Sequence, residues 1–351
     1  MVHQRRSNTR NRQRSSNCSV RSRVLNAINN PLKIRFKTRR RMKYNMELKR
    51  EFKERSRELL GSEAEDYFQI LREPLTNALR INTLKITINA LKKRLKNKDW
   101  ELKPVPFCKQ GYWVESGPMK LGSTLEHFLG YYYIQDPASM IPPLTMDLRE
   151  EQKVLDIAAS PGSKTGQIVS IMNDEGLIIA NDVRIDRVSI LKINLQRIGA
   201  RSVVITRRNG MNYKKMTGFF DRVLVDAPCS GEGVIRKNPY AAVQWNPNSF
   251  PKFSRVQKKL IKAGYQALKP GGLLVYSTCS LAPEENEEVI DYLLKNSDAE
   301  VEQIKIKGLK SKPGVTEWQG EKYHKEINKC IRVYPQDNNT EGFFVCKVRK
   351  R

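Results

Sequence analysis

Short runs of β-forming residues alternate with helical segments in the part of the chain that begins near residue 150. The runs are Val154–Ala158, Leu177–Ala180, Val203–Thr206, Arg222–Val225 and Leu273–Tyr276. Between them, Arg187–Ile198 has apolar residues at helical spacing. Because strands joined through helices pair in parallel and bury both faces, this order predicts an α/β fold with a doubly wound, mostly parallel sheet. We also predict a late strand over 342–346.

Composition divides the 351-residue chain into three predicted parts. Residues 1–43 hold fourteen Lys and Arg and no acidic residue, and we expect this extension to be disordered. Residues 44–125 predict a small α/β module. It contains a helix over 44–61, a strand at Ala78–Asn82 and a helix capped by Thr87. Residues 126–351 form the predicted main domain.

The formal net charge of +27 indicates a polyanionic partner, most simply nucleic acid. The first 43 residues contribute fourteen of these charges, so the remainder of the chain is basic as well. The alternative is a solvated tail on an ordinary protein. Basic side chains also crowd the helix that follows Thr87, and they either face RNA or are simply solvated: Lys92, Lys93, Arg94, Lys96 and Lys98.

Several classes of protein are disfavoured by the sequence. The six cysteines form no C-x-x-C pair and no Cys/His cluster, so we predict neither a metal site nor a disulfide framework. No apolar run approaches the roughly 20 residues of a membrane span. The N-terminus lacks the apolar region of a secretory signal. We therefore expect a reduced, cytoplasmic protein that has no membrane partner and acts as a monomer.

The first predicted strand of the main domain runs into a loop of small residues and then a helix start. Residues Ala158–Thr165 are Ala-Ala-Ser-Pro-Gly-Ser-Lys-Thr. Small side chains let a ligand approach the backbone, and the helix N-terminus offers free N–H groups. The P-loop and dinucleotide glycine spacings are absent, which leaves the amino-acid end of S-adenosylmethionine as the third candidate. Asp182, after the second strand, suits a ribose.

Two cysteines follow two predicted strands. Cys229 lies in Asp226–Gly231 and Cys279 in Tyr276–Ser280. Free cysteine is most often a small buried apolar residue. However, the carboxyl ends of parallel strands commonly carry active sites, which favours a thiol nucleophile with a thiol helper. A thiolate that adds to cytosine C6 makes C5 nucleophilic. Product release then needs loss of the C5 proton, and Asp226 supplies an acid for N3. On this reasoning either cysteine could attack.

The chain resembles the Nop/Sun family of RNA cytosine-5 methyltransferases, most closely its compact archaeal tRNA members, from about residue 70 onward. The motifs that carry the resemblance are Asp156–Thr165, Asp226–Gly231, Thr278–Ser280 and Pro283–Glu287, with weaker support from Leu79–Lys85, Tyr132–Pro142, Arg332–Pro335 and Gly342–Phe344. The resemblance implies a Rossmann-like class I methyltransferase domain, an RNA-binding N-terminal module and S-adenosylmethionine as cofactor. It implies tRNA as substrate. The alternatives are rRNA, or a non-catalytic RNA-binding or ribosome-assembly factor on the same scaffold.

The resemblance also implies roles for individual residues. Cys279 would attack C6, Cys229 would assist product release, Asp226 would hold the cytosine edge near N3 and N4, and Lys164 would line the catalytic pocket. The implied cofactor residues are Ala158, Ala159, Ser160, Pro161, Gly162, Ser163, Lys164, Asp182, Arg187, Asn209 and Asp226. Ser160 replaces the family's usual alanine. Asn209 replaces an aspartate that contacts the adenine amino group. Since an amide carbonyl can accept the same hydrogen bond, we expect cofactor binding to be retained.

Overall fold

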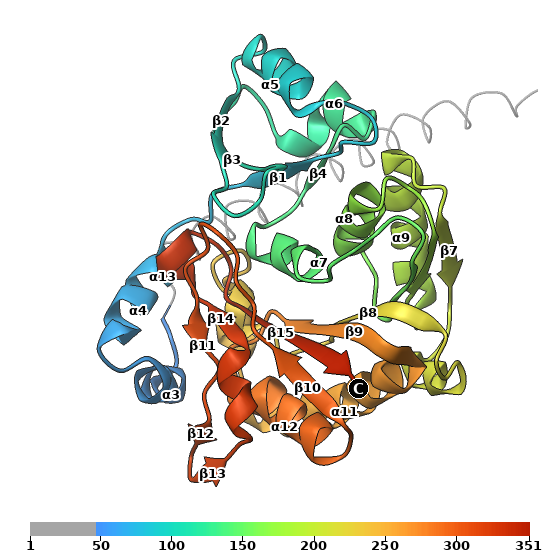
Figure 1. Cartoon of the computed structure of the whole chain (residues 1–351). Coiled ribbons are helices and arrows are strands. Elements are labelled where there is room, and N and C mark those ends of the chain that lie inside the picture. The colour runs from blue at the N-terminus through green and yellow to red at the C-terminus, as the bar shows by residue number, and fades with distance from the viewer. Residues whose placement is uncertain (1–46) are drawn as a thin grey trace, which may run out of the picture. The chain divides into compact units, whose positions relative to one another are not determined.

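A nine-stranded sheet organises the main domain in the computed structural model, which describes residues 47–351 (Figure 1). The predicted extension 1–43 lies outside the described residues. The parallel half of the sheet has the order β7-β6-β5-β8-β9. Its strands are β5 (Lys153–Asp156), β6 (Leu177–Asn181), β7 (Val203–Thr206), β8 (Phe220–Asp226) and β9 (Leu268–Thr278). The chain runs from β5 outward to β7 and then returns to β8, which creates a crevice at the carboxyl ends of β5 and β8.

Antiparallel strands complete this sheet beyond β9. They are β10 (Ala299–Glu302), β11 (Lys312–Pro313), β14 (Ile331–Val333) and β15 (Phe343–Lys350). Strand β15 confirms the predicted late strand and pairs with β9, with Phe344 opposite Thr278. The beginning of β15 therefore lies beside the end of β9, where Cys279 follows.

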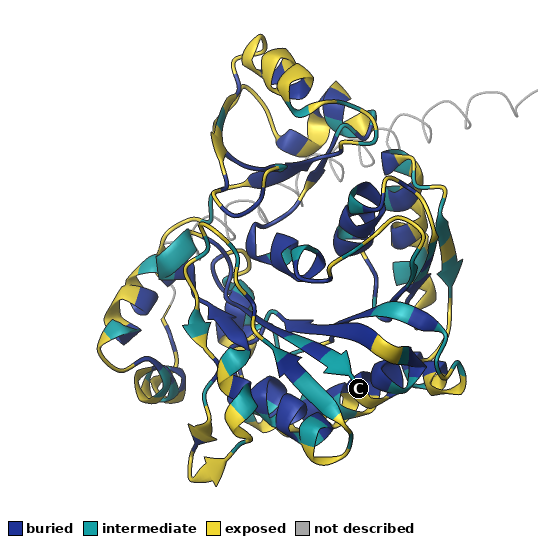
Figure 2. Ribbon diagram, viewed as in Figure 1, coloured by how far each residue is buried: buried dark blue, intermediate teal, exposed yellow. Residues whose placement is uncertain are grey.

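Helices cover both faces of the sheet, as predicted for a doubly wound fold. Val223 and Val225 of β8 pack in the same apolar cluster as α11 (Phe250–Ala267) and α12 (Glu287–Lys295). Leu224 points to the opposite face and packs in the cluster that includes α7 (Ile141–Leu144) and α8 (Ser163–Ile171). Helix α9 (Ile185–Ile198) packs near β6 and β7. The central strands β5 and β9 are mostly buried between these layers (Figure 2).

The N-terminal module contains a four-stranded antiparallel sheet of order β2-β3-β1-β4. Its strands are β1 (Ala78–Ile81), β2 (Glu101–Pro104), β3 (Gly111–Ser116) and β4 (Tyr132–Ile134). Thr87 caps α5 (Ile88–Lys96) as predicted, because its side chain accepts the Ala90 N–H. Strand β4 follows residue 125, the predicted end of this module, and still pairs with β1. The domain boundaries stay predictions.

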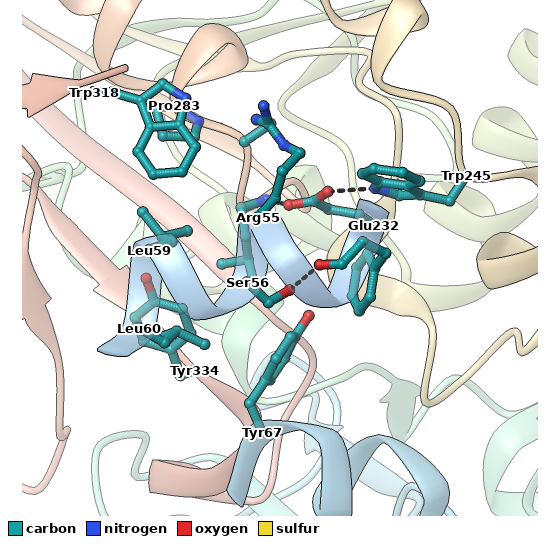
Figure 3. Close-up of a pocket in the computed structure, with 13 residues that line it drawn as sticks. Arg55, Ser56, Leu59, Leu60, Tyr67, Glu232, Trp245, Pro283, Trp318 and Tyr334 are labelled. Atoms are coloured by element: carbon teal, nitrogen blue, oxygen red, sulfur yellow. Dashed lines mark hydrogen bonds between the residues drawn. The ribbon is translucent and has the colours of Figure 1, made fainter. Parts of the chain in front are cut away.

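Helix α3 (Arg50–Leu60) covers the chain segment that follows Cys229. The predicted helix over 44–61 thus begins at Arg50 and ends before Gly61, whose φ of 57° suits glycine. Figure 3 shows α3 lying along Glu232, which accepts a hydrogen bond from the Trp245 indole at 2.8 Å. A cavity of about 20 Å³ remains here, room for about one water molecule.

The remaining helices and strands are short. They are α4 (Ala64–Arg72), α6 (Leu125–Phe128), α10 (Tyr240–Gln244), α13 (Pro335–Asn338), β12 (Glu317–Trp318) and β13 (Glu321–Lys322). Within residues 47–351, no helix combines the length and the apolar character needed to cross a membrane. In the same range, no group of three or more His, Cys, Asp and Glu side chains is arranged to hold a metal ion.

Candidate active site

A pocket of about 280 Å³ lies at the carboxyl ends of the parallel strands. The residues from the sequence prediction that line it are Ala158, Ala159, Ser160, Pro161, Ser163, Lys164, Asp226 and Cys279. The lining residues that the site prediction omitted include Tyr133, Asp136, Asp156, Lys237, Glu341 and Phe343. The loop after β5 and the ends of β8 and β9 therefore meet around one space, as the strand-end argument predicts.

The loop after β5 turns into α8 at Gly162. This residue has a φ of 104°, a conformation that favours glycine, and it forms the N-cap of α8. A Cβ on Gly162 would also lie 3.0 Å from Leu191 of α9. Gly162 therefore lets the loop bend closely against α9, and the small residues before it face the pocket.

Asp156 ends β5 and is buried beneath this loop. Its Oδ2 atom accepts a hydrogen bond from Thr165 Oγ1 at 2.7 Å, whereas Oδ1 has no hydrogen-bond partner. Burial raises the pKa of Asp156 to about 7. An unpartnered carboxylate oxygen beside a pocket suits a cationic ligand group, such as the ammonium of an amino acid. The residues present thus fit the amino-acid end of S-adenosylmethionine.

Asp182 and Arg187 are linked to the same loop without lining the pocket. Arg187 Nε lies 3.2 Å from Asp182 Oδ2, and Arg187 Nη2 donates to the Ser160 carbonyl at 2.6 Å. Ser160 Oγ donates in turn to the Arg187 carbonyl at 2.9 Å. The hydroxyl at Ser160, where the family pattern has alanine, therefore anchors the loop to α9.

Asn209 follows β7 and is exposed. Its Oδ1 atom accepts the Met211 N–H at 3.0 Å, which caps the following 3-10 turn. The pocket-lining residues do not include it. Asn181, which the site prediction omitted, organises this region instead, because its buried amide donates to the Ile157 and Arg208 carbonyls at 3.0 Å each.

Asp226 ends β8 and is held from two sides. Lys164 Nζ lies 2.7 Å from Asp226 Oδ2, and Ser277 Oγ donates to Oδ1 at 2.8 Å. Lys164 is almost fully buried, and its ammonium also lies 5.1 Å from the centre of the Phe343 ring. A carboxylate and an ammonium are thus fixed side by side at the pocket wall.

The two predicted thiols are neighbours. The Sγ atoms of Cys229 and Cys279 lie 3.2 Å apart, and both residues are half-buried. The hydrogen bond with Cys279, together with burial, raises the pKa of Cys229 well above its ordinary range. Cys229 therefore keeps its proton and can donate it to Cys279 Sγ.

An acidic pair that also lines the pocket was not part of the predicted site. The backbone N–H of Glu341 lies 3.3 Å from both carboxylate oxygens of Asp136, and Lys237 Nζ lies 3.0 Å from Glu341 Oε1. Burial, and then the charge of Glu341, raises the pKa of Asp136 to about 7. No spacing in the sequence signals this pair, because its two acids are 205 positions apart.

Comparisons with known proteins identify the relatives of this chain. A family model described as 16S rRNA methyltransferase RsmB/F matches residues 143–349, and one described as the N-terminal domain of 16S rRNA methyltransferase RsmF matches residues 48–137. The tRNA (cytosine(49)-C(5))-methyltransferase of Pyrococcus abyssi is 44% identical, over 87% of this chain and 99% of its own length.

One further relative is a longer protein, and another has a solved structure. Ribosomal RNA small subunit methyltransferase F of Vibrio campbellii is 39% identical over 82% of this chain, but the matched region is only 59% of that protein. A solved methyltransferase homolog protein from Pyrococcus horikoshii is similar with a TM-score of 0.78 at 35% identity, covering 87% of this chain and 96% of that one. The predicted fold class and the Nop/Sun resemblance are confirmed. The chain belongs to the RsmB/F family and is an S-adenosylmethionine-dependent RNA cytosine-5 methyltransferase.

Proposed function

We propose that this enzyme methylates C5 of a cytosine in tRNA through a covalent bond between Cys279 Sγ and cytosine C6. The observation that carries the proposal is the 3.2 Å separation of the two Sγ atoms at the ends of adjacent parallel strands. Addition of the Cys279 thiolate to C6 moves an electron pair to C5. S-adenosylmethionine supplies the electrophilic methyl group that C5 accepts. The adduct then loses the C5 proton, the C6–S bond breaks and the thiolate is regenerated.

Asp226 and Lys164 would hold the cytosine during this addition. A carboxylate oxygen of Asp226 can accept from the N4 amino group, which distinguishes cytosine from uracil. Negative charge develops on the pyrimidine at N3 and O2 as the thiolate adds to C6. The Lys164 ammonium, already 2.7 Å from Asp226, is positioned to stabilise that charge.

Cys229 would act after the adduct forms. While Cys279 is free, its hydrogen bond and its charge raise the pKa of Cys229 and keep that thiol protonated. Both effects end once Cys279 Sγ is bonded to carbon. Cys229 can then ionise more readily and assist the loss of the C5 proton, the step that precedes release of the product.

We assign the cofactor to the loop Ala158–Lys164, with Asp156 receiving its ammonium group. Asp182 would hold the ribose, and Arg187 would fix that carboxylate. Two observations support this assignment: the unpartnered Asp156 Oδ1 atom and the link from Asp182 through Arg187 to Ser160. Asn209 stays the predicted adenine contact, because its Oδ1 atom can accept a second hydrogen bond besides that of the Met211 N–H.

The substrate proposal rests on the relative from Pyrococcus abyssi, because that tRNA methyltransferase matches over 99% of its length. rRNA is the second candidate, favoured by the bacterial relatives whose names specify ribosomal RNA. Methyl transfer to separated tRNA and rRNA pools, followed by mapping of the modified cytosine, decides between them. Label found only in rRNA would overturn the tRNA assignment.

Cysteine variants test the mechanism. Cys279→Ser should abolish methyl transfer, whereas Cys229→Ala should accumulate a covalent RNA adduct that survives a denaturing gel. Cys108→Ala is the control, since that buried thiol belongs to a different part of the chain and should leave the gel pattern unchanged. Full activity of Cys279→Ser, or a Cys229→Ala gel without an adduct, would contradict the two-thiol mechanism.

A further inference from the structure

One buried carboxylate contacts the segments that carry both thiols. Glu285 lies in the 3-10 turn Pro283–Glu285 and is completely buried. Its Oε2 atom accepts the backbone N–H of Ser230, the residue after Cys229, at 2.9 Å. Its Oε1 atom accepts the hydroxyl of Ser280, the residue after Cys279, at 2.7 Å. A single side chain therefore joins two loops that are fifty residues apart in sequence.

Gln257 of α11 extends this contact to the other side of Cys229. Its Nε2 atom donates to Glu285 Oε2 at 2.9 Å and to the carbonyl of Pro228 at 2.9 Å. The residues before and after Cys229 are thus both held, one by Gln257 and one by Glu285. Since Gln257 is itself fully buried in α11, these contacts are anchored to a long helix and not to another loop.

The next residue along the chain secures Cys279 in the same way. The Asn286 amide accepts from Thr278 Oγ1 at 2.6 Å and donates to the Ser280 carbonyl at 2.9 Å. These two partners flank Cys279. The Asn286 amide bonds only to the Cys279 segment. Of Glu285 and Asn286, it is therefore Glu285 that connects this segment to the Cys229 loop.

We infer that Glu285 is a positioning residue that sets the separation of the Cys229 and Cys279 thiols. The inference rests on the proposed function, in which both thiols act on one cytosine. Glu285 and Asn286 both belong to the Pro283–Glu287 motif. Helix α12 begins at Glu287, after the 3-10 turn that carries Glu285.

Thiol–disulfide exchange measures this separation without RNA or cofactor. The full chain is equilibrated with reduced and oxidised glutathione. One protein thiolate attacks the glutathione disulfide and releases one glutathione. The second protein thiol then displaces the other glutathione, which yields a Cys229–Cys279 disulfide and two glutathione thiols. The equilibrium ratio gives the effective concentration of one thiol at the other, and peptide mass spectrometry identifies the linked pair.

Glu285→Gln should lower this effective concentration at least about tenfold relative to the wild type. An amide keeps only one acceptor oxygen for the three donors that Glu285 now accepts, which are Ser230 N–H, Gln257 Nε2 and Ser280 Oγ. Glu284→Gln is the matched control, because the neighbouring carboxylate pairs with Arg55 at 2.9 Å and contacts neither cysteine loop. It should behave as the wild type. Equal effective concentrations in Glu285→Gln and the wild type would overturn the inference.

A second variant keeps the inference testable if Glu285→Gln does not fold. Ser280→Ala removes one donor to Glu285 and the 3.2 Å contact between the Ser280 and Ser230 hydroxyls, and it should change the effective concentration in the same direction. In methylation assays, Glu285→Gln should lower kcat with little change in KM for RNA, since it alters thiol geometry and not the substrate surface. If Cys279→Ser stays active, the proposed mechanism fails while the exchange result still stands. The two failures are therefore distinguishable.

Discussion

Replacing Gly233 by alanine tests how closely three active-site segments meet. The Gly233 N–H donates to the Cys279 carbonyl, and the Gly233 carbonyl accepts from the Gly342 N–H, each at 2.9 Å. A Cβ on Gly233 would lie 2.3 Å from the Gly342 carbonyl oxygen and 2.7 Å from the Cys279 carbonyl oxygen. Both oxygens belong to the backbone, so neither can rotate away as a flexible side chain would.

The magnitude follows from these contacts. Each backbone hydrogen bond is worth about 1 kcal/mol. Forced overpacking typically costs about 1–3 kcal/mol. We therefore expect Gly233→Ala to lower the free energy of unfolding by about 3 kcal/mol. Because the carbonyl that must move belongs to Cys279, kcat for methyl transfer should fall at least about tenfold.

Urea unfolding followed by circular dichroism measures the first effect, and steady-state methylation at saturating RNA measures the second. Gly122→Ala is the control. A Cβ there would meet only Ile134 Cδ1, at 3.9 Å, and we expect a stability change within about 0.5 kcal/mol. A Gly233→Ala protein with wild-type unfolding energy and wild-type kcat would refute the close approach of these loops.

Two further predictions concern ligands. The pKa of Asp156 is about 7, so its carboxyl group is largely protonated at pH 6 and largely ionised at pH 8. The affinity for the cationic amino-acid end of the cofactor should therefore rise as the pH increases through 7. Calorimetric titration of Asp156→Asn should show weaker binding at pH 7.5 and a flatter pH profile; a profile as steep as that of the wild type would reject Asp156 as the ammonium partner. Lys93 and Lys96 are exposed on α5, and a Lys93→Ala, Lys96→Ala double variant should reduce the salt slope of RNA binding by about 0.7 for each lost phosphate contact. An unchanged slope would mean that these lysines are merely solvated.

Local patterns explain why much of the fold could be predicted. The β-type runs around Val154, Val203 and Val223 are short and bounded by turn residues, so strand positions and the α/β class follow from neighbouring residues alone. Asp156, Asp226 and Cys279 also lie close to the ends of the runs that begin at Val154, Arg222 and Leu273. Since parallel strands share one carboxyl edge, the approximate location of the pocket could be deduced before any contact was known.

Side-chain use within loops was less predictable. Asn209 follows β7 where an adenine contact was expected, yet its amide caps a 3-10 turn. Pro283 and Glu284 lie in a 3-10 turn, and the next residue but one, Asn286, bonds through its side chain to the Cys279 segment. In both cases a short polar side chain can form a hydrogen bond with either a local backbone group or a distant one. Sequence spacing does not predict which of the two bonds forms.

The sequence by itself determined the alternation of strands and helices, the basic charge and the presence of two cysteines at strand ends. The tertiary structure decided which of these residues meet. The two Sγ atoms lie 3.2 Å apart because β8 and β9 are paired in register, with Asp226 opposite Ser277. Strand order, and the antiparallel placement of β15 beside β9, depend on how helices cover both faces of the sheet. Contacts such as Asp136 with Glu341, or Glu285 with both cysteine loops, exist only once that packing has brought distant segments together.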